Sequence, residues 1–187
     1  MKLLSWILLA VIIVFCVFYT YDYFTMPKIE NISKANNCLT NTDIDIFGQF
    51  KNANYSIYLP KEWQFATLNA GNTQETYSFI INPNDNYEFF SIWSRDYNKD
   101  ADALILETLK PITNYKIDLQ DNIKTANGET LKKISITLKN ESGDYKQELF
   151  AFVKNEKGYL LLARVKSQNY NIYANTINKI TCSFKVN

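Results

Sequence analysis

The side chains that could carry catalysis in this chain are carboxylates, because its 187 residues include no histidine. Without histidine there is no Ser-His-Asp or Cys-His nucleophile system, no His-containing zinc site and no common near-neutral proton carrier. The five glycines form neither a phosphate-binding loop nor a nucleophile elbow. An acid pair among Glu88, Glu129 and Glu148 is the remaining option, although strand carboxylates are more often solvated or paired with lysine. We therefore expect no catalytic residue, no cofactor and no enzymatic activity, with an acid-pair hydrolase as a remote alternative.

Two acidic residues, Asp43 and Asp45, stand two positions apart in a polar stretch. Carboxylates at this spacing could touch a cation, but no glycine or third acid completes a calcium-binding loop. A solvated loop is the simpler interpretation, so no metal site is predicted.

The residues that could bind a ligand or partner are one arginine and three aromatics. Arg164 interrupts a strongly apolar strand, and arginine suits bidentate carboxylate pairing better than lysine does. A structural ion pair is the expectation for Arg164, and contact with a ligand or partner is the alternative. The aromatics Tyr58, Trp63 and Trp93 could line a pocket or patch, but core packing is favoured because aromatic side chains dominate such cores.

The three cysteines divide into one in the apolar N-terminal run, Cys16, and two near the ends of the rest of the chain, Cys38 and Cys182. Disulfides persist in oxidising compartments, so an exported domain could join Cys38 to Cys182. Two free thiols are the equal alternative, because a sequence gives no distance between the sulfur atoms.

The N-terminal run 3–21 is free of charge and, as a helix rising ~1.5 Å per residue, would span about 28 Å, close to the thickness of a bilayer core. No small-residue cleavage site follows it, and Phe15 stands before Cys16 where a lipidated cysteine needs a small neighbour. Residues 1–25 are therefore predicted to be an uncleaved, single-pass signal anchor. A short basic tail stays inside easily, so the C-terminal domain is predicted outside the inner (cytoplasmic) membrane, in the periplasm or outside the cell.

The rest of the chain is predicted to form a polar connector, residues 26–44, and one domain, residues 45–187. Its central feature is a hairpin of strands 145–154 and 159–166 joined by a Gly-containing turn at 155–158. Both faces of both strands are apolar, so both must be covered, yet the short link makes the pair antiparallel. The strand over 129–139 is apolar on one face only, which places it further from the centre of the sheet.

The remaining elements follow from periodicity and end signals. Helices are predicted from a cap at Asp100 to Lys110 and from a cap at Ser167 through Ile180. Further strands are predicted over 55–60, 76–81, 87–94, 115–125 and 182–186. The fold class is therefore α+β, with a central antiparallel sheet covered by helices on both faces.

The opening Tyr55-x-Ile57-x-Leu59-Pro60-x-x-Trp63, followed by hairpins, a helix, a meander and a last helix leading into Ser183-Phe184, resembles the PsbP/DcrB/Mog-type α/β/α sandwich over residues 45–187. The resemblance implies a noncatalytic module, since members look like assembly, stability or partner-binding factors, often tethered outside a bacterial membrane. It carries no active-site motif, so no residue inherits a role from it.

The formal net charge of +1, with acidic and basic residues interspersed, gives no field that would attract nucleic acid. We expect a membrane-anchored, extracytoplasmic protein-binding or assembly/stability module whose partner is a membrane or extracytoplasmic protein. The alternative is a small-ligand domain for a lipid or peptide. A deep apolar pocket would favour the ligand, and a filled core with an exposed apolar patch would favour the partner.

Overall fold

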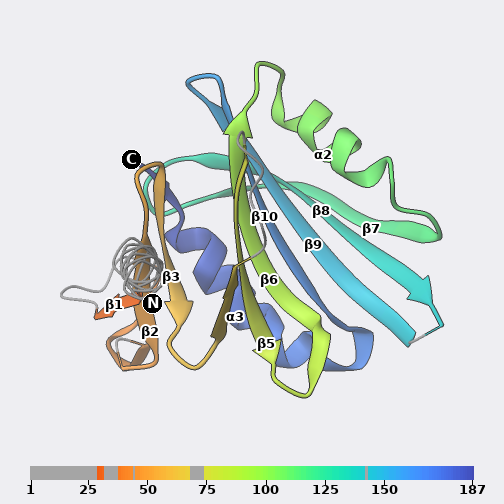
Figure 1. Ribbon diagram of the computed structural model, residues 1–187, viewed down its shortest axis with the longest axis horizontal. Helices are drawn as coiled ribbons and strands as arrows, with labels where there is room; N and C mark the ends of the chain where they lie inside the picture. The colour runs from red at the N-terminus through yellow and green to blue at the C-terminus, as the bar shows by residue number, and fades with distance from the viewer. Residues whose placement is uncertain (1–28, 32–37, 44, 68–73, 142) are drawn as a thin grey trace, which may run out of the picture.

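The computed structural model describes residues 29–31, 38–43, 45–67, 74–141 and 143–187, and this part consists mostly of β-strands with two α-helices (Figure 1). A seven-stranded sheet has the order β4-β5-β6-β10-β9-β8-β7, and a four-stranded sheet has the order β1-β2-β3-β11. All neighbouring strands are antiparallel. The strands are β1 (Ile29–Asn31), β2 (Phe47–Lys51), β3 (Tyr55–Pro60), β4 (Gln64–Thr67), β5 (Gln74–Asn82), β6 (Asp85–Asp96), β7 (Tyr115–Lys124), β8 (Thr130–Asn140), β9 (Gly143–Lys154), β10 (Lys157–Lys166) and β11 (Lys185–Val186). The helices are α2 (Ala101–Leu109) and α3 (Tyr170–Ser183), with single 3-10 turns η1 (Asn41–Asp43) and η2 (Ser167–Asn169).

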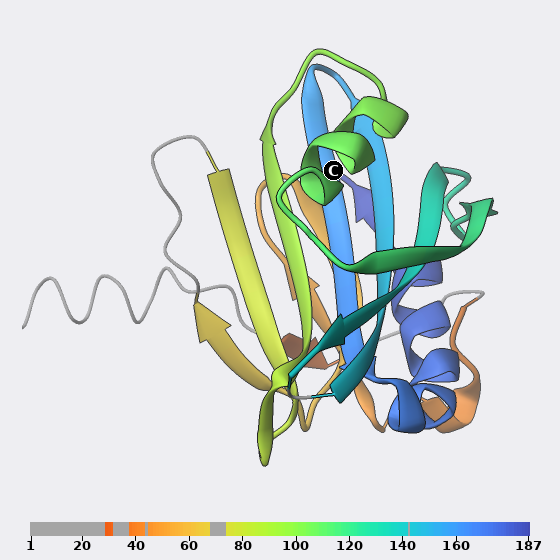
Figure 2. The same ribbon diagram turned by 90° about the vertical axis from the view of Figure 1, so that its right-hand side faces the viewer.

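The large sheet lies between two covering layers, as Figures 1 and 2 show. Helix α2 packs on one face, over β8, β9 and β10, and α3 packs between β10 and β3 on the other. The cover of both faces was predicted, but the helices do not supply it alone. The small sheet forms much of the second layer, with Phe50, Tyr55 and Ile57 completely buried in the same core as α3.

Helix α2 begins where the sequence predicts, because Asp100 Oδ1 accepts a hydrogen bond of 2.7 Å from the Ala103 backbone N–H. The start and end of α3 differ from the prediction. Ser167 opens the 3-10 turn η2 instead of capping α3, and no side chain caps η2 or α3. The helix also runs on through Ser183, whose hydroxyl donates to the Ile180 carbonyl at 2.6 Å, so the predicted closing strand shrinks to the two residues of β11.

The turn between β9 and β10 consists of Asn155 and Glu156, both with positive φ (52° and 58°), as a two-residue type I′ hairpin turn requires. Gly158 lies inside β10 and not in the turn, contrary to the prediction. A Cβ atom there would stand 3.0 Å from Tyr97 Cβ and 3.2 Å from Leu104 Cδ2. Gly158 is therefore a packing residue that lets the segment before α2 and α2 itself approach β10.

Two contacts fix the N-terminal end of the domain to α3. Cys38 and Cys182 are joined by a disulfide, the pairing that the sequence left open. Asp43 Oδ1 accepts a hydrogen bond of 2.6 Å from Lys179 Nζ, and its Oδ2 accepts two more from Thr40. The Lys179 ammonium, followed by Thr40, lowers the pKa of the Asp43 carboxyl to about 2. Asp43 therefore serves as an anchor for α3, while Asp45 is exposed.

The predicted membrane anchor (residues 1–25) and most of the connector lie outside the described residues. Within the described ranges, neither helix has the length and apolar character to cross a bilayer. No group of three or more side chains suited to a metal ion occurs in the same ranges.

We predict that replacing Cys38 or Cys182 by serine lowers the free energy of unfolding by about 4 kcal/mol, because the bridge closes a very long loop in the unfolded chain. Urea unfolding of the full-length protein measures the change, and Cys16→Ser is the control because Cys16 is outside the pair. Reduction should destabilise the wild type and leave Cys38→Ser unchanged. Alkylation of both thiols in unreduced, denatured protein would show that the bridge is absent.

The Asp43–Lys179 contact predicts a pH dependence of stability. Because folding lowers the pKa of Asp43 from 3.8 to about 2, its stabilisation is fully present above pH 3.8 and is lost as the pH falls through about 2. Asp43→Asn should therefore be less stable than the wild type at pH 7 and similar to it near pH 2. Urea midpoints measured across this range test the prediction, with Asp45→Asn as the matched control. A constant difference between Asp43→Asn and wild type at every pH would contradict it.

Candidate functional site

The structure separates the sequence-predicted binding residues between the two faces of the large sheet. Trp63 is only 5% exposed and packs against Phe90 with ring centroids 6.0 Å apart, in the core shared with α3. Tyr58 is half-buried against the same core. Neither residue lies near Arg164 or Trp93, which both belong to the α2 face.

The α2 face can be followed through the pairing register, because directly opposed residues of neighbouring strands share a face. Trp93 on β6 opposes Leu160 on β10, and Arg164 on β10 opposes Phe89 on β6 and Gln147 on β9. Helix α2 packs over the β8–β9–β10 side of this face and leaves part of β6 and β10 uncovered. We call this uncovered region the open strip; it consists of Tyr87, Phe89, Trp93, Leu162 and Arg164. Tyr87 is 55% exposed and the other four are half-buried.

Arg164 is held in the open strip without an ion pair. Its Nε and Nη2 donate to Gln147 Oε1 at 2.9 and 2.7 Å, and its guanidinium carbon lies 5.1 Å from the centre of the Phe89 ring. No carboxylate of the described residues forms a salt bridge with it, so the predicted structural ion pair is wrong. The neutral Gln147 takes that place because the β9–β10 register sets it directly opposite. Burial lowers the pKa of the Arg164 guanidinium, a sign that its charge is partly removed from water.

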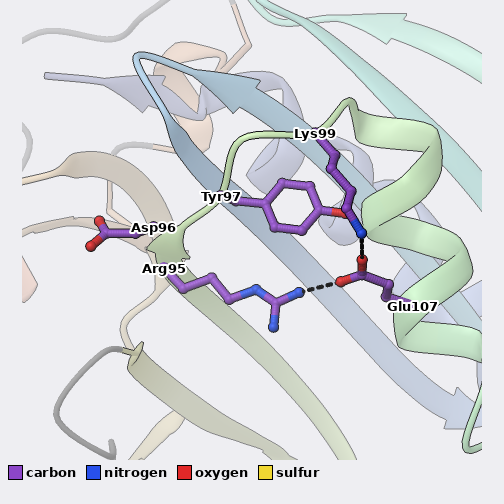
Figure 3. A pocket seen from close by; sticks show the side chains of 5 residues that line it. All are labelled: Arg95, Asp96, Tyr97, Lys99 and Glu107. Carbon is purple, nitrogen blue, oxygen red and sulfur yellow. Dashed lines mark hydrogen bonds and ion pairs between the residues drawn. The ribbon is translucent and has the colours of Figure 1, made fainter.

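A recess of about 400 Å³ lies where the end of β6 meets α2 (Figure 3). Its first lining residue, Arg95, stands two residues after Trp93 of the open strip. Arg95 stacks between Trp93 and Tyr97, with its guanidinium carbon 5.2 and 5.0 Å from the two ring centres. Glu107 on α2 accepts from Arg95 Nη2 at 2.8 Å and from Lys99 Nζ at 2.9 Å. The recess is lined by these charged side chains together with Tyr97 and Asp96, whose carboxylate points away from the others in Figure 3. The second arginine therefore differs from Arg164 in having a carboxylate partner, which it shares with Lys99.

Glu148, one of the carboxylates considered for an acid pair, is instead engaged in structural contacts. It is 2% exposed, and its Oε1 accepts from Lys133 Nζ and Tyr170 Oη, both at 2.7 Å, and from Ser135 Oγ at 3.1 Å. Burial and then the Glu148 hydrogen bond raise the pKa of Tyr170. Glu148 thus ties the first residue of α3 to the sheet.

Glu88, on the neighbouring strand β6, likewise ties the chain that leads into α3 to the sheet. It is completely buried and accepts hydrogen bonds from the Lys166 backbone N–H and from Asn169 Nδ2, each 2.9 Å, and from Asn82 Nδ2 at 2.8 Å. Strand β10 separates Glu88 from Glu148, so the two do not form an acid pair. Glu129 is engaged with the Thr125 hydroxyl at 2.8 Å. All three carboxylates therefore have structural contacts.

Sequence reasoning missed Arg95 and Gln147 as members of the α2 face. Arg95 stands two residues after Trp93, so strand alternation alone would have placed them together. Gln147 lies in the polar run 146–148 ahead of the apolar part of β9, so its residue type did not set it apart from its neighbours. The pairing of Gln147 with Arg164 depends on register between two strands, which alternation does not provide.

No protein-family model matches the chain, and no curated protein matches it. Solved structures do show a likeness. Cyanobacterial PsbP from Synechocystis sp. PCC 6803 superposes with a TM-score of 0.56 at 9% identity, covering 80% of this chain and 97% of that one. LpqN, involved in cell envelope biogenesis of Mycobacterium tuberculosis, gives a TM-score of 0.47 at 11% identity over 71% of this chain and 82% of its own.

The Ran-binding protein Mog1p of Saccharomyces cerevisiae gives a TM-score of 0.45 at 12% identity, covering 71% of this chain and 89% of that one. The likeness to PsbP, with its TM-score of 0.56 at 9% identity, establishes a shared fold and not a shared activity. The predicted resemblance to the PsbP/Mog type is confirmed at that level: the domain has the PsbP/Mog fold.

Proposed function

We propose that this protein is a noncatalytic binding module that holds a protein partner against the open strip of its large sheet. The observation that carries the proposal is the open strip itself, in which partly exposed aromatics surround a half-buried arginine without a carboxylate partner. Aromatic and arginine side chains are the residues that dominate the binding energy of protein interfaces. They stand here on central strands of a sheet whose backbone is fixed, so ordering them on binding costs little conformational entropy.

The proposal includes a place of action outside the cytoplasm, on the membrane. The Cys38–Cys182 disulfide supports an oxidising compartment. The charge-free run 3–21 supports a single-pass anchor, and the polar connector of residues 26–44 would keep the domain near the bilayer. Tethering of this kind raises the effective concentration of the domain toward other membrane or extracytoplasmic proteins.

The absence of catalysis is part of the proposal, supported by the engagement of the candidate carboxylates. Glu88 and Glu148 hold the start of α3, and each accepts several hydrogen bonds. A general acid or base has to reach a substrate proton in a cleft. These two side chains are buried between the sheet and α3 instead.

The recess at Arg95 favours the alternative of a small-ligand domain. Its volume of about 400 Å³ falls within the range of ligand sites. Its lining, however, consists mostly of charged side chains, three of which already pair with one another, whereas sites for lipids and drug-sized ligands have largely apolar walls. Partner binding through the open strip therefore stays the first proposal.

We predict that a photocrosslinking amino acid at Tyr87 joins the full-length protein to one partner protein in its native membrane. Tyr87 is exposed at the end of the open strip, so the exchange should leave the fold intact. The matched control is the same amino acid at Ile172, which is 71% exposed on α3, away from the strip. Mass spectrometry should identify an adduct at Tyr87 that is missing at Ile172. Identical adducts at both positions, or none at Tyr87, would contradict the proposal.

A further inference from the structure

We propose that the open strip recognises an acidic side chain flanked by apolar residues in the partner, and that Arg164 receives its carboxylate. This inference rests on the proposed function and deepens it by giving the chemistry of the partner segment. In this inference Gln147 and Phe89 fix the orientation of the Arg164 guanidinium before the partner binds.

Arg164 carries a partly buried positive charge that has no counter-ion among the described residues. The side chain is half-buried, and within the described residues its guanidinium donates only to Gln147 Oε1. Arginine has five N–H donors and stays charged in proteins, so donor capacity is left over. A partly desolvated charge without a counter-ion costs free energy, which a carboxylate at the same place would offset.

Gln147 and Phe89 hold the Arg164 guanidinium in a fixed orientation. Gln147 is completely buried, and its single oxygen accepts from both Nε and Nη2, while the Phe89 ring lies along the guanidinium. These contacts fix the plane of the group before any partner arrives, which favours bidentate carboxylate binding. The buried Gln147 Nε2 has no hydrogen-bond partner in the described part of the chain, so the polar centre of the strip offers donors and is short of acceptors.

Apolar and aromatic side chains surround Arg164 on the open strip. Phe89, Leu162 and Tyr87 are the partly exposed neighbours on the same face, and Trp93 continues the strip toward α2. They would contact the residues on either side of the incoming acid, so the matching segment is apolar or aromatic around one Asp or Glu. Exclusion of water by those contacts strengthens the charge-assisted hydrogen bonds at the centre.

The chain provides its own control, because Arg95 and Arg164 are its two arginines. Arg95 lies on the same face and also stacks on aromatic rings, but it already pairs with a carboxylate, that of Glu107, which it shares with Lys99. A partner segment that binds an unpaired guanidinium should therefore bind Arg164 and not Arg95. Nonspecific attraction to positive charge would affect both arginines.

The experiment uses full-length protein in mild detergent, labelled with ¹⁵N only in arginine, so that two Nε–H signals are expected. Arg164→Lys and Arg95→Lys assign them. The probe is a capped hexapeptide of leucine and phenylalanine around one aspartate, and its twin carries asparagine instead. The aspartate peptide should shift the Arg164 signal saturably and leave the Arg95 signal in place, and the asparagine twin should bind at least about tenfold more weakly.

A second variant tests the role of the free charge separately from the surface. Gln147→Glu places a carboxylate where Gln147 Oε1 now accepts both hydrogen bonds, so Arg164 acquires an internal partner of nearly the same shape. This variant should keep its fold by circular dichroism and lose the shift caused by the aspartate peptide. Unchanged peptide binding by a folded Gln147→Glu would overturn the inference.

Several other results would also overturn it. These are equal responses to the two peptides, a response of Arg95 alone, no response up to about 10 mM peptide, or a shift of Arg164 by added phosphatidylglycerol that the aspartate peptide does not reproduce. If the Tyr87 crosslink is found alongside any of these, partner binding at the strip stands and only the carboxylate is wrong. If the crosslink is also missing, the proposed function fails with it.

Discussion

The structure depends on one constraint: strands β9 and β10 are apolar on both faces, so neither face of their sheet can be left in water. Leu149, Phe150, Leu160 and Leu161 are all completely buried, two on each side. One face is closed by α2 and the other by α3 with the small sheet. Two carboxylates buried under this second layer collect donors from the chain that leads into α3: Glu88 accepts from the Lys166 backbone N–H and Asn169, and Glu148 Oε1 accepts from Tyr170. Cover on the α2 side is incomplete, and the open strip is where it stops.

Much of this arrangement could be predicted because it follows from local patterns. Apolar alternation located β9 and β10 at the centre and β8 nearer the edge, and Asp100 marked the start of α2. The small sheet could not be predicted in the same way, because its strands are short and β11 pairs with β3 across most of the chain. Gly158 was assigned to a turn on its residue type, whereas its true constraint comes from the Tyr97 side chain packed against it.

The candidate site shows the same limit more sharply. Alternation places Arg164 on the same face of β10 as Leu160 and Leu162, but it cannot say which residue of the next strand lies opposite. Register decides that question, and it brings the neutral Gln147 to Arg164 where a carboxylate was expected. Trp63 shares its residue type with Trp93, yet it lies on the other face, in the core. Residue type therefore suggests which side chains could form a binding site, and strand pairing decides which of them lie together.

The disulfide has a mechanical consequence for any force that reaches the domain through the chain ahead of Cys38. Tension arriving there passes through the covalent bridge directly to Cys182, at the end of α3. Strands β2 to β10 and helix α2 all lie within the closed loop between these cysteines, so a pull between the chain ahead of Cys38 and the chain after Cys182 bypasses them. Under load the oxidised domain thus behaves as an inextensible unit, and reduction of a single bond would turn it into one that can be unravelled.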